Sequence, residues 1–304
     1  MKRILLMALS LCALSFSQAE PLKVVTSFSI LEDLTHNIGQ DKITVESIIK
    51  RGQDAHSFEP TPKDILKIQN ADVVVINGLG FDYWMSKILE NNKYEGIIID
   101  TSHNVPLISF SDSDHDHDHD HDHDHDHGDF DPHIWQNPQN VMIMTKNIEE
   151  GLSLALPEDA PYFQNNYESY HEKLMQIDQY AKEKLDHQGK ESLMVLHNSF
   201  GYLAERYHLH FVAISDVNPL AEPSAKKMSE LYKLVKTENI YAIFSENIAP
   251  SRFVSTLVKD LKLKDGGILY SDALTTEPPA ESYLQLFKTN VDTIAKTLTN
   301  TAKD

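Results

Sequence analysis

The 304-residue sequence contains a single cysteine, Cys12, and it lies in the first apolar stretch of the chain. A disulfide framework and a zinc site made of cysteine thiolates are therefore excluded. Beyond this stretch, no run reaches the roughly 18 apolar residues that a membrane-spanning helix needs. With a formal net charge of -19, the chain also lacks the basic footprint that nucleic acids and anionic membranes require of a partner. These absences favour a soluble globular protein that does not bind nucleic acid.

The N-terminus has the three parts of a secretory signal. Lys2 and Arg3 are basic, residues 4–14 are apolar, and a small-residue cleavage site ends at Ala19. A lipid anchor on Cys12 is the alternative, but Leu11 stands where a small residue is expected, and the apolar region would be cut short. We therefore expect residues 1–19 to be a cleaved signal peptide and the mature protein to be exported.

Lys and Arg are absent between Lys93 and Lys146, and this gap contains a run of alternating Asp and His. Residues 112–131 hold ten Asp, and no apolar residue lies between Phe110 and Gly128, so the segment cannot bury a core. We expect a surface loop at residues 109–129. Its closely spaced imidazoles predict weak, multidentate metal binding, because a flexible chain loses entropy when it is ordered around an ion; a solvated polyanionic tract is the alternative. The histidines are His115, His117, His119, His121, His123, His125 and His127.

Short β-rich runs alternate with helical patterns in both halves of the chain, which predicts parallel βα units. Between the halves, apolar residues recur every three or four positions from about residue 159 to residue 187, as in a long helix with one buried face. The sequence thus predicts an α/β fold of two lobes with parallel sheets. The expected segments are the signal 1–19, an N-terminal lobe 20–158, a linker helix 159–188 and a C-terminal lobe 189–304. The expected strands are 22–26, 43–49, 72–76, 97–99, 192–196, 210–214, 240–244 and 268–270.

Three histidines follow predicted strands or the Asp-His run. His56 comes after the second strand, His133 directly after the run, and His197 after the strand 193–196. Ligands collect at the carboxyl ends of the strands in parallel α/β sheets, where His56 and His197 would lie. Taken singly, each histidine is better explained as an ordinary, partly buried residue. Together, three neutral imidazoles would supply most of a tetrahedral zinc shell.

Five motifs are spread in order over the whole mature chain. They are Ala55-His56-Ser57-Phe58-Glu59-Pro60-Thr61-Pro62, Asp131-Pro132-His133-Ile134-Trp135, His197-Asn198-Ser199-Phe200-Gly201-Tyr202, Ala221-Glu222-Pro223-Ser224 and Phe244-Ser245-Glu246. In this order they resemble the motifs of the metal-binding solute-receptor proteins of zinc and manganese ABC importers, known as cluster A-I. The acidic His-rich insert is similar to that of the zinc-specific periplasmic members.

The resemblance implies a metal site in the cleft between the lobes, with His56 and His133 from the first lobe and His197 from the second. It implies Asp272 as the fourth ligand. Some zinc-type members have an acidic residue before the first histidine, where this chain has Ala55; this leaves Asp272 or a water to complete the shell. Glu246 is either a carboxylate that supports a ligand or a solvated strand end.

The function that this resemblance implies is capture of Zn²⁺ in the periplasm, by a monomer, and its delivery to the membrane permease of a zinc ABC transporter. A manganese or iron receptor of the same family is the nearest alternative, although histidine at position 197 is typical of the zinc type. An exported zinc hydrolase is a third possibility. The sequence has neither a His-Glu-x-x-His motif nor a serine nucleophile elbow, and we therefore expect no enzyme.

Overall fold

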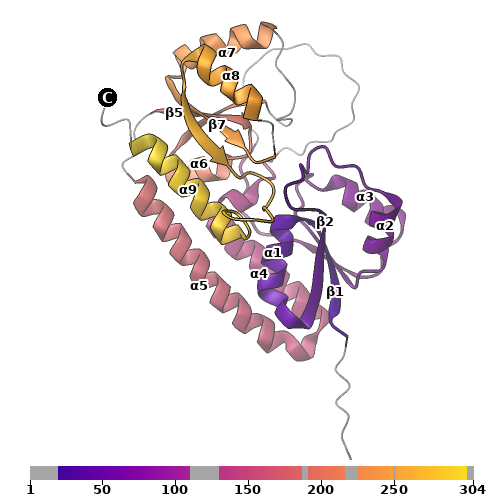
Figure 1. Ribbon diagram of the computed structural model, residues 1–304. Coiled ribbons are helices and arrows are strands. Elements are labelled where there is room, and N and C mark those ends of the chain that lie inside the picture. The colour runs from indigo at the N-terminus through magenta and orange to yellow at the C-terminus, as the bar shows by residue number, and fades with distance from the viewer. Residues whose placement is uncertain (1–19, 110–129, 187–190, 216–224, 249–250, 300–304) are drawn as a thin grey trace, which may run out of the picture.

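Two α/β lobes make up the computed structural model (Figure 1). Each lobe has a four-stranded parallel sheet, with strand order β2-β1-β3-β4 in the first and β6-β5-β7-β8 in the second. The predicted two-lobed α/β fold with parallel sheets is thereby confirmed. The structure describes residues 20–109, 130–186, 191–215, 225–248 and 251–299. The strands are β1 (Leu22–Phe28), β2 (Ile43–Ile49), β3 (Val73–Ile76), β4 (Ile97–Asp100), β5 (Ser192–His197), β6 (His210–Ser215), β7 (Ile240–Glu246) and β8 (Lys264–Leu269).

Helices join the strands and cover the sheets. The longest, α5 (Ala160–Leu185), lies within the stretch predicted as the linker helix and runs beside both lobes, with α9 along part of its length (Figure 1). Among the described residues, no helix has the length and apolar character needed to cross a membrane. The other helices are α1 (Ser29–Gly39), η1 (Gln40–Lys42), α2 (Pro62–Gln69), α3 (Tyr83–Asn91), η2 (Ile134–Gln136), α4 (Pro138–Ala155), η3 (Pro157–Asp159), α6 (Gly201–Tyr207), α7 (Ala225–Thr237), α8 (Ser251–Leu261) and α9 (Tyr283–Thr299).

Local sequence chemistry accounts for the connection that carries His56. Thr61 caps α2 in a reciprocal capping box with Asp64, and Pro62 occupies the first turn, as the Thr-Pro pair predicts. The capping box fixes where the β2–α2 connection ends. At its other end, the Gly52 amide donates to the Leu274 carbonyl in the second half of the chain (2.8 Å). The connection is therefore held at both ends.

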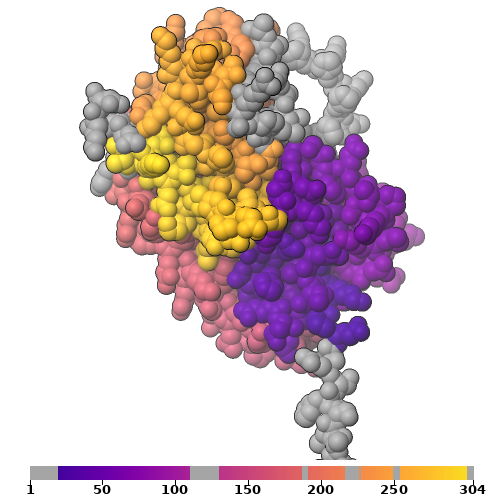
Figure 2. Space-filling view, in the orientation of Figure 1, coloured from indigo at the N-terminus to yellow at the C-terminus, as the bar shows by residue number. Residues whose placement is uncertain are grey.

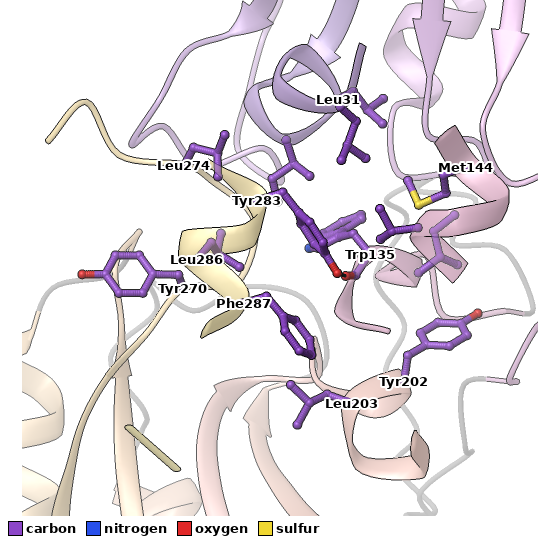
Figure 3. Packing of buried hydrophobic residues seen from close by; sticks show 14 of the residues in the cluster. Leu31, Trp135, Met144, Tyr202, Leu203, Tyr270, Leu274, Tyr283, Leu286 and Phe287 are labelled. Atoms are coloured by element: carbon purple, nitrogen blue, oxygen red, sulfur yellow. Dashed lines mark hydrogen bonds between the residues drawn. The ribbon is translucent and has the colours of Figure 1, made fainter. Parts of the chain in front are cut away.

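One hydrophobic core continues through both lobes. Trp135, in η2, and Tyr283, at the start of α9, are both fully buried at its centre, and the Tyr283 hydroxyl donates to the Trp135 carbonyl (2.9 Å; Figure 3). In the space-filling view, the C-terminal part of the chain, in yellow, lies directly against the first lobe, in indigo and violet (Figure 2). The junction between the lobes is thus a packed interior, and the residues that meet there are held rigidly.

The second sheet differs from the prediction in one strand. The sequence predicts a strand at residues 268–270, whereas β8 begins at Lys264 and ends at Leu269. The part that the prediction misses, residues 264–267, contains Gly266 and Gly267, which have low β-propensity and hide the start of the strand from pattern analysis. Pairing with β7 establishes it instead, with an irregular register between Ile243 and Ser245.

Candidate metal centre

All four predicted ligands come together between the lobes. His56 lies in the β2–α2 connection, His133 directly precedes η2, His197 is the last residue of β5, and Asp272 follows β8. One ligand atom from each lies within 4.8 Å of the others. The side chains of His133, His197 and Asp272 are at most 1% exposed, and that of His56 is 13% exposed. His56 therefore forms the edge of the site that is nearest to solvent.

The separations suit a metal ion. Tetrahedral zinc, with bonds of about 2.0–2.1 Å, places its ligand atoms roughly 3.3 Å apart. Here Oδ2 of Asp272 lies 3.1 Å from Nε2 of His197 and 3.3 Å from Nε2 of His56. The Oδ1 atom of the same carboxylate lies 3.9 Å from Nε2 of His133. A small inward shift would bring all four groups to tetrahedral distances.

Two of these atoms have no hydrogen-bond partner although they are buried: Nε2 of His133 and Oδ1 of Asp272. Leaving a buried polar atom unpaired costs about 1–3 kcal/mol. Two such atoms facing one point make a purely structural role for this cluster an expensive arrangement. Buried nitrogen and oxygen atoms left unpaired in this way are expected where a metal ion binds to them.

The charges of the centre are coupled. Burial opposes a positive charge on His197, but the carboxylates of Glu246 and Asp272 outweigh burial and raise the pKa of His197 well above its usual value. Burial likewise opposes ionisation of Asp272, but the imidazoles of His197, His56 and His133 hold its pKa well below the usual range. The surroundings thus favour a protonated His197 and an ionised Asp272.

Carboxylates stand behind two of the imidazoles. Glu246, only 2% exposed, lies with Oε2 2.6 Å from Nδ1 of His197, and its Oε1 accepts the His197 amide (3.1 Å). Glu246 is therefore buried against His197 and is not a solvated strand end. Asp131 lies 2.7 Å from Nδ1 of His133 and also accepts its backbone amide. Such contacts fix the ring orientation and leave Nε2 to face a metal.

The sequence places Asp131 in the motif around His133 but does not by itself indicate a role for it. The signal that points to a role is its position two residues before His133, the spacing at which a side chain reaches the following backbone amide. Gly201, at the start of α6, is a second such residue, because a Cβ atom there would lie 2.6 Å from Oδ2 of Asp131. Glycine lets the second lobe approach the carboxylate that orients His133.

The seven loop histidines and Cys12 lie outside the described residues. Both arms of the loop are described at its base, where Ser109 and Phe130 form an antiparallel bridge. The Tyr202 hydroxyl, from α6, donates to the Asp131 carbonyl next to this bridge (2.9 Å). The base of the loop is therefore anchored two residues from His133.

The protein has two α/β lobes with parallel sheets, and imidazole and carboxylate groups converge between them. This combination is that of a two-lobed metal-binding receptor. The chain belongs to the family described as ZnuA, zinc-uptake complex component A, periplasmic, whose model matches residues 24–297. This is a family of substrate-binding proteins of metal ABC transporters.

Relatives in this family are named for different metals. The chain is 30% identical to the iron-binding protein YfeA of Yersinia pestis, over 91% of this chain and 86% of that protein. It is 31% identical to the zinc-binding lipoprotein AdcA of Streptococcus pneumoniae, over 98% of this chain and 61% of that protein. The Mn-bound structure of a periplasmic metal binding protein from Candidatus Liberibacter asiaticus is 28% identical, with a TM-score of 0.77 over 91% of this chain and 99% of that one.

Proposed function

We propose that this protein captures Zn²⁺ in the periplasm, through His56, His133, His197 and Asp272, and delivers it to the membrane permease of an ABC transporter. The observation that carries the proposal is the donor set of three imidazole nitrogens and one carboxylate at near-tetrahedral separations. Imidazole-rich four-ligand sites suit zinc, whereas manganese is suited by oxygen-rich sites with higher coordination numbers.

Manganese and iron are the alternative metals, because relatives named for them are about as similar in sequence to this chain as the relative named for zinc. Histidine at position 197 favours zinc over these two metals, because its imidazole nitrogen is a softer donor than a carboxylate oxygen at the same position would be. We further propose that residues 1–19 are a signal peptide, and that the mature receptor is a monomer with lobes 20–158 and 189–304 joined by residues 159–188.

Hydrolysis by a bound zinc would need an open coordination position and a nearby general base. Asp131 and Glu246, the carboxylates beside the ligands, are instead in contact with imidazole Nδ1 atoms. Glu59, in the His56 motif, is exposed. These contacts favour a receptor over a hydrolase.

A competition titration of the metal-free protein with Zn²⁺, Mn²⁺ and Fe²⁺ tests the proposal. We expect one tight site per chain. Its zinc-to-manganese affinity ratio should be larger than the Irving–Williams order alone predicts. His197→Glu is the matched variant, and it should lower the zinc-to-manganese affinity ratio. A wild-type ratio equal to that of His197→Glu would favour the manganese or iron receptor instead.

The raised pKa of His197 predicts that zinc must displace a proton from this imidazole. Affinity should therefore fall as pH is lowered, by up to about tenfold per pH unit below the pKa of His197 for the one displaced proton. Calorimetry in two buffers of different ionisation enthalpy counts the protons released. In Glu246→Gln, which removes one of the carboxylates that raise the pKa, fewer protons should be released near neutral pH. Equal proton release in both proteins would contradict this prediction.

A further inference from the structure

The backbone carbonyl next to Asp272 receives two buried side-chain donors. Nε1 of Trp135 donates to the carbonyl oxygen of Ser271 (2.8 Å), and Nε2 of Gln136 donates to the same oxygen (3.0 Å). Trp135 and Gln136 belong to η2, which begins directly after His133. The segment that carries one candidate ligand thus holds the residue that precedes another.

Glutamine is an unusual residue at the fully buried position 136 if its side chain only fills space. Its side chain is fully buried, and its Oε1 atom has no hydrogen-bond partner. A buried amide whose oxygen accepts no hydrogen bond lowers the stability of the fold relative to an apolar side chain of equal size. The donor that points to Ser271 is the feature that an apolar residue could not supply.

The same turn is fixed on the other side of Asp272. The Leu274 carbonyl accepts the Gly52 amide (2.8 Å), and the Leu274 amide donates to Oγ of Ser29 (3.0 Å). With Ser271 held by η2, the backbone on both flanks of Asp272 is bonded to the first lobe. The backbone that carries the carboxylate is therefore restrained on both sides.

We propose that Gln136, together with Trp135, is a positioning residue for Asp272 and that it tunes the metal selectivity of the centre. This inference rests on the proposed metal-binding function. A carboxylate whose backbone is fixed at near-tetrahedral distance from His197 and His56 suits a four-coordinate ion. An ion that prefers six oxygen-rich ligands needs the carboxylate to swing and make room for further ligands. Loosening the Ser271 carbonyl should permit that movement.

The test variant is Gln136→Met, in which the flexible methionine fills the volume of glutamine but has no N–H donor. The Ser271 carbonyl keeps its bond from Trp135, and the unpaired Oε1 disappears, so the melting temperature of the metal-free protein should hardly change. Zinc affinity should fall by up to about tenfold, the lower end of the loss seen when a direct partner of a metal ligand is removed, because Gln136 acts on Asp272 through Ser271. Manganese affinity should fall by less. The zinc-to-manganese ratio should therefore decrease.

A second readout is the visible absorption of the Co²⁺-loaded protein, which is intense for tetrahedral cobalt and weak for six-coordinate cobalt. We expect weaker bands in Gln136→Met. Asn166→Leu is the matched control, because it removes a side-chain amide that donates to the Ile38 carbonyl (2.9 Å) at the α5–α1 contact, outside the four-ligand group. It should leave the ratio and the cobalt spectrum as in wild type.

Trp135→Phe provides a variant with the aromatic ring retained and the other donor to Ser271 removed, and it should shift the ratio in the same direction. A zinc-to-manganese ratio equal to wild type in both variants would overturn the proposal, whatever their absolute affinities. Failure of the proposed function itself looks different, because the wild-type protein would then have no tight site that depends on His133 or Asp272.

Discussion

His197→Ala is expected to weaken tight zinc binding by about a hundredfold. Four-ligand structural zinc sites bind with roughly 10–16 kcal/mol, so one ligand accounts for about 3 kcal/mol, or about two powers of ten. Water replaces the lost imidazole poorly, and the variant also deprives Glu246, which is buried in the wild-type protein, of the ring that it contacts. His56→Ala and His133→Ala should each cause losses of similar size. Equilibrium competition with a chromophoric chelator measures the effect.

His171→Ala is the control for these variants, since His171 lies on α5 and is not one of the four converging residues. Its affinity should equal that of wild type. The ligand variants should still fold, because the core that joins the lobes is built from apolar side chains such as Trp135, Tyr283 and Phe287. If the variant without all three imidazoles binds one zinc as tightly as wild type, the ligand assignment is wrong.

The lobes and the converging histidines could be predicted because their signals are local. The fully buried run Val73–Ile76 is a continuous apolar stretch. His56 follows β2 and His197 ends β5, so each lies at the carboxyl end of a strand in the parallel sheet of its own lobe, where ligands collect. Asp272 is predicted only by the family resemblance. It stands three residues beyond β8, whose first four residues include two glycines and are not recognisable as a strand from the sequence.

The supports of the ligands could not be predicted in the same way. The sequence does not decide between the two roles of Glu246. A residue at a strand end is buried or solvated according to what packs above it, and the sequence does not specify that packing. Gln136 donates to Ser271, a residue 135 positions away. Such pairs depend on how η2 meets the turn after β8, which is decided by packing between the lobes.

The second large effect is expected from deleting residues 114–127, which removes seven imidazoles and seven carboxylates of the Asp-His run but no candidate cleft ligand. The bridge between Ser109 and Phe130 already brings the two arms together, so a shorter connection can close without moving Asp131. Calorimetric titration of the intact protein should give one tight zinc phase and then weaker binding of further ions. The deletion should retain the tight phase and lose most of the weak phase.

Two conditions sharpen this comparison. Below about pH 6 the weak phase of the intact protein should disappear first, because protonated imidazole cannot bind metal and weak sites have little binding energy to oppose protonation. In cells the deletion should reduce zinc uptake only when zinc is scarce, since the run would act by raising the local zinc concentration beside the cleft. If instead the tight phase vanishes with the run while His56, His133 and His197 remain, the Asp-His run is the primary site and the cleft model fails.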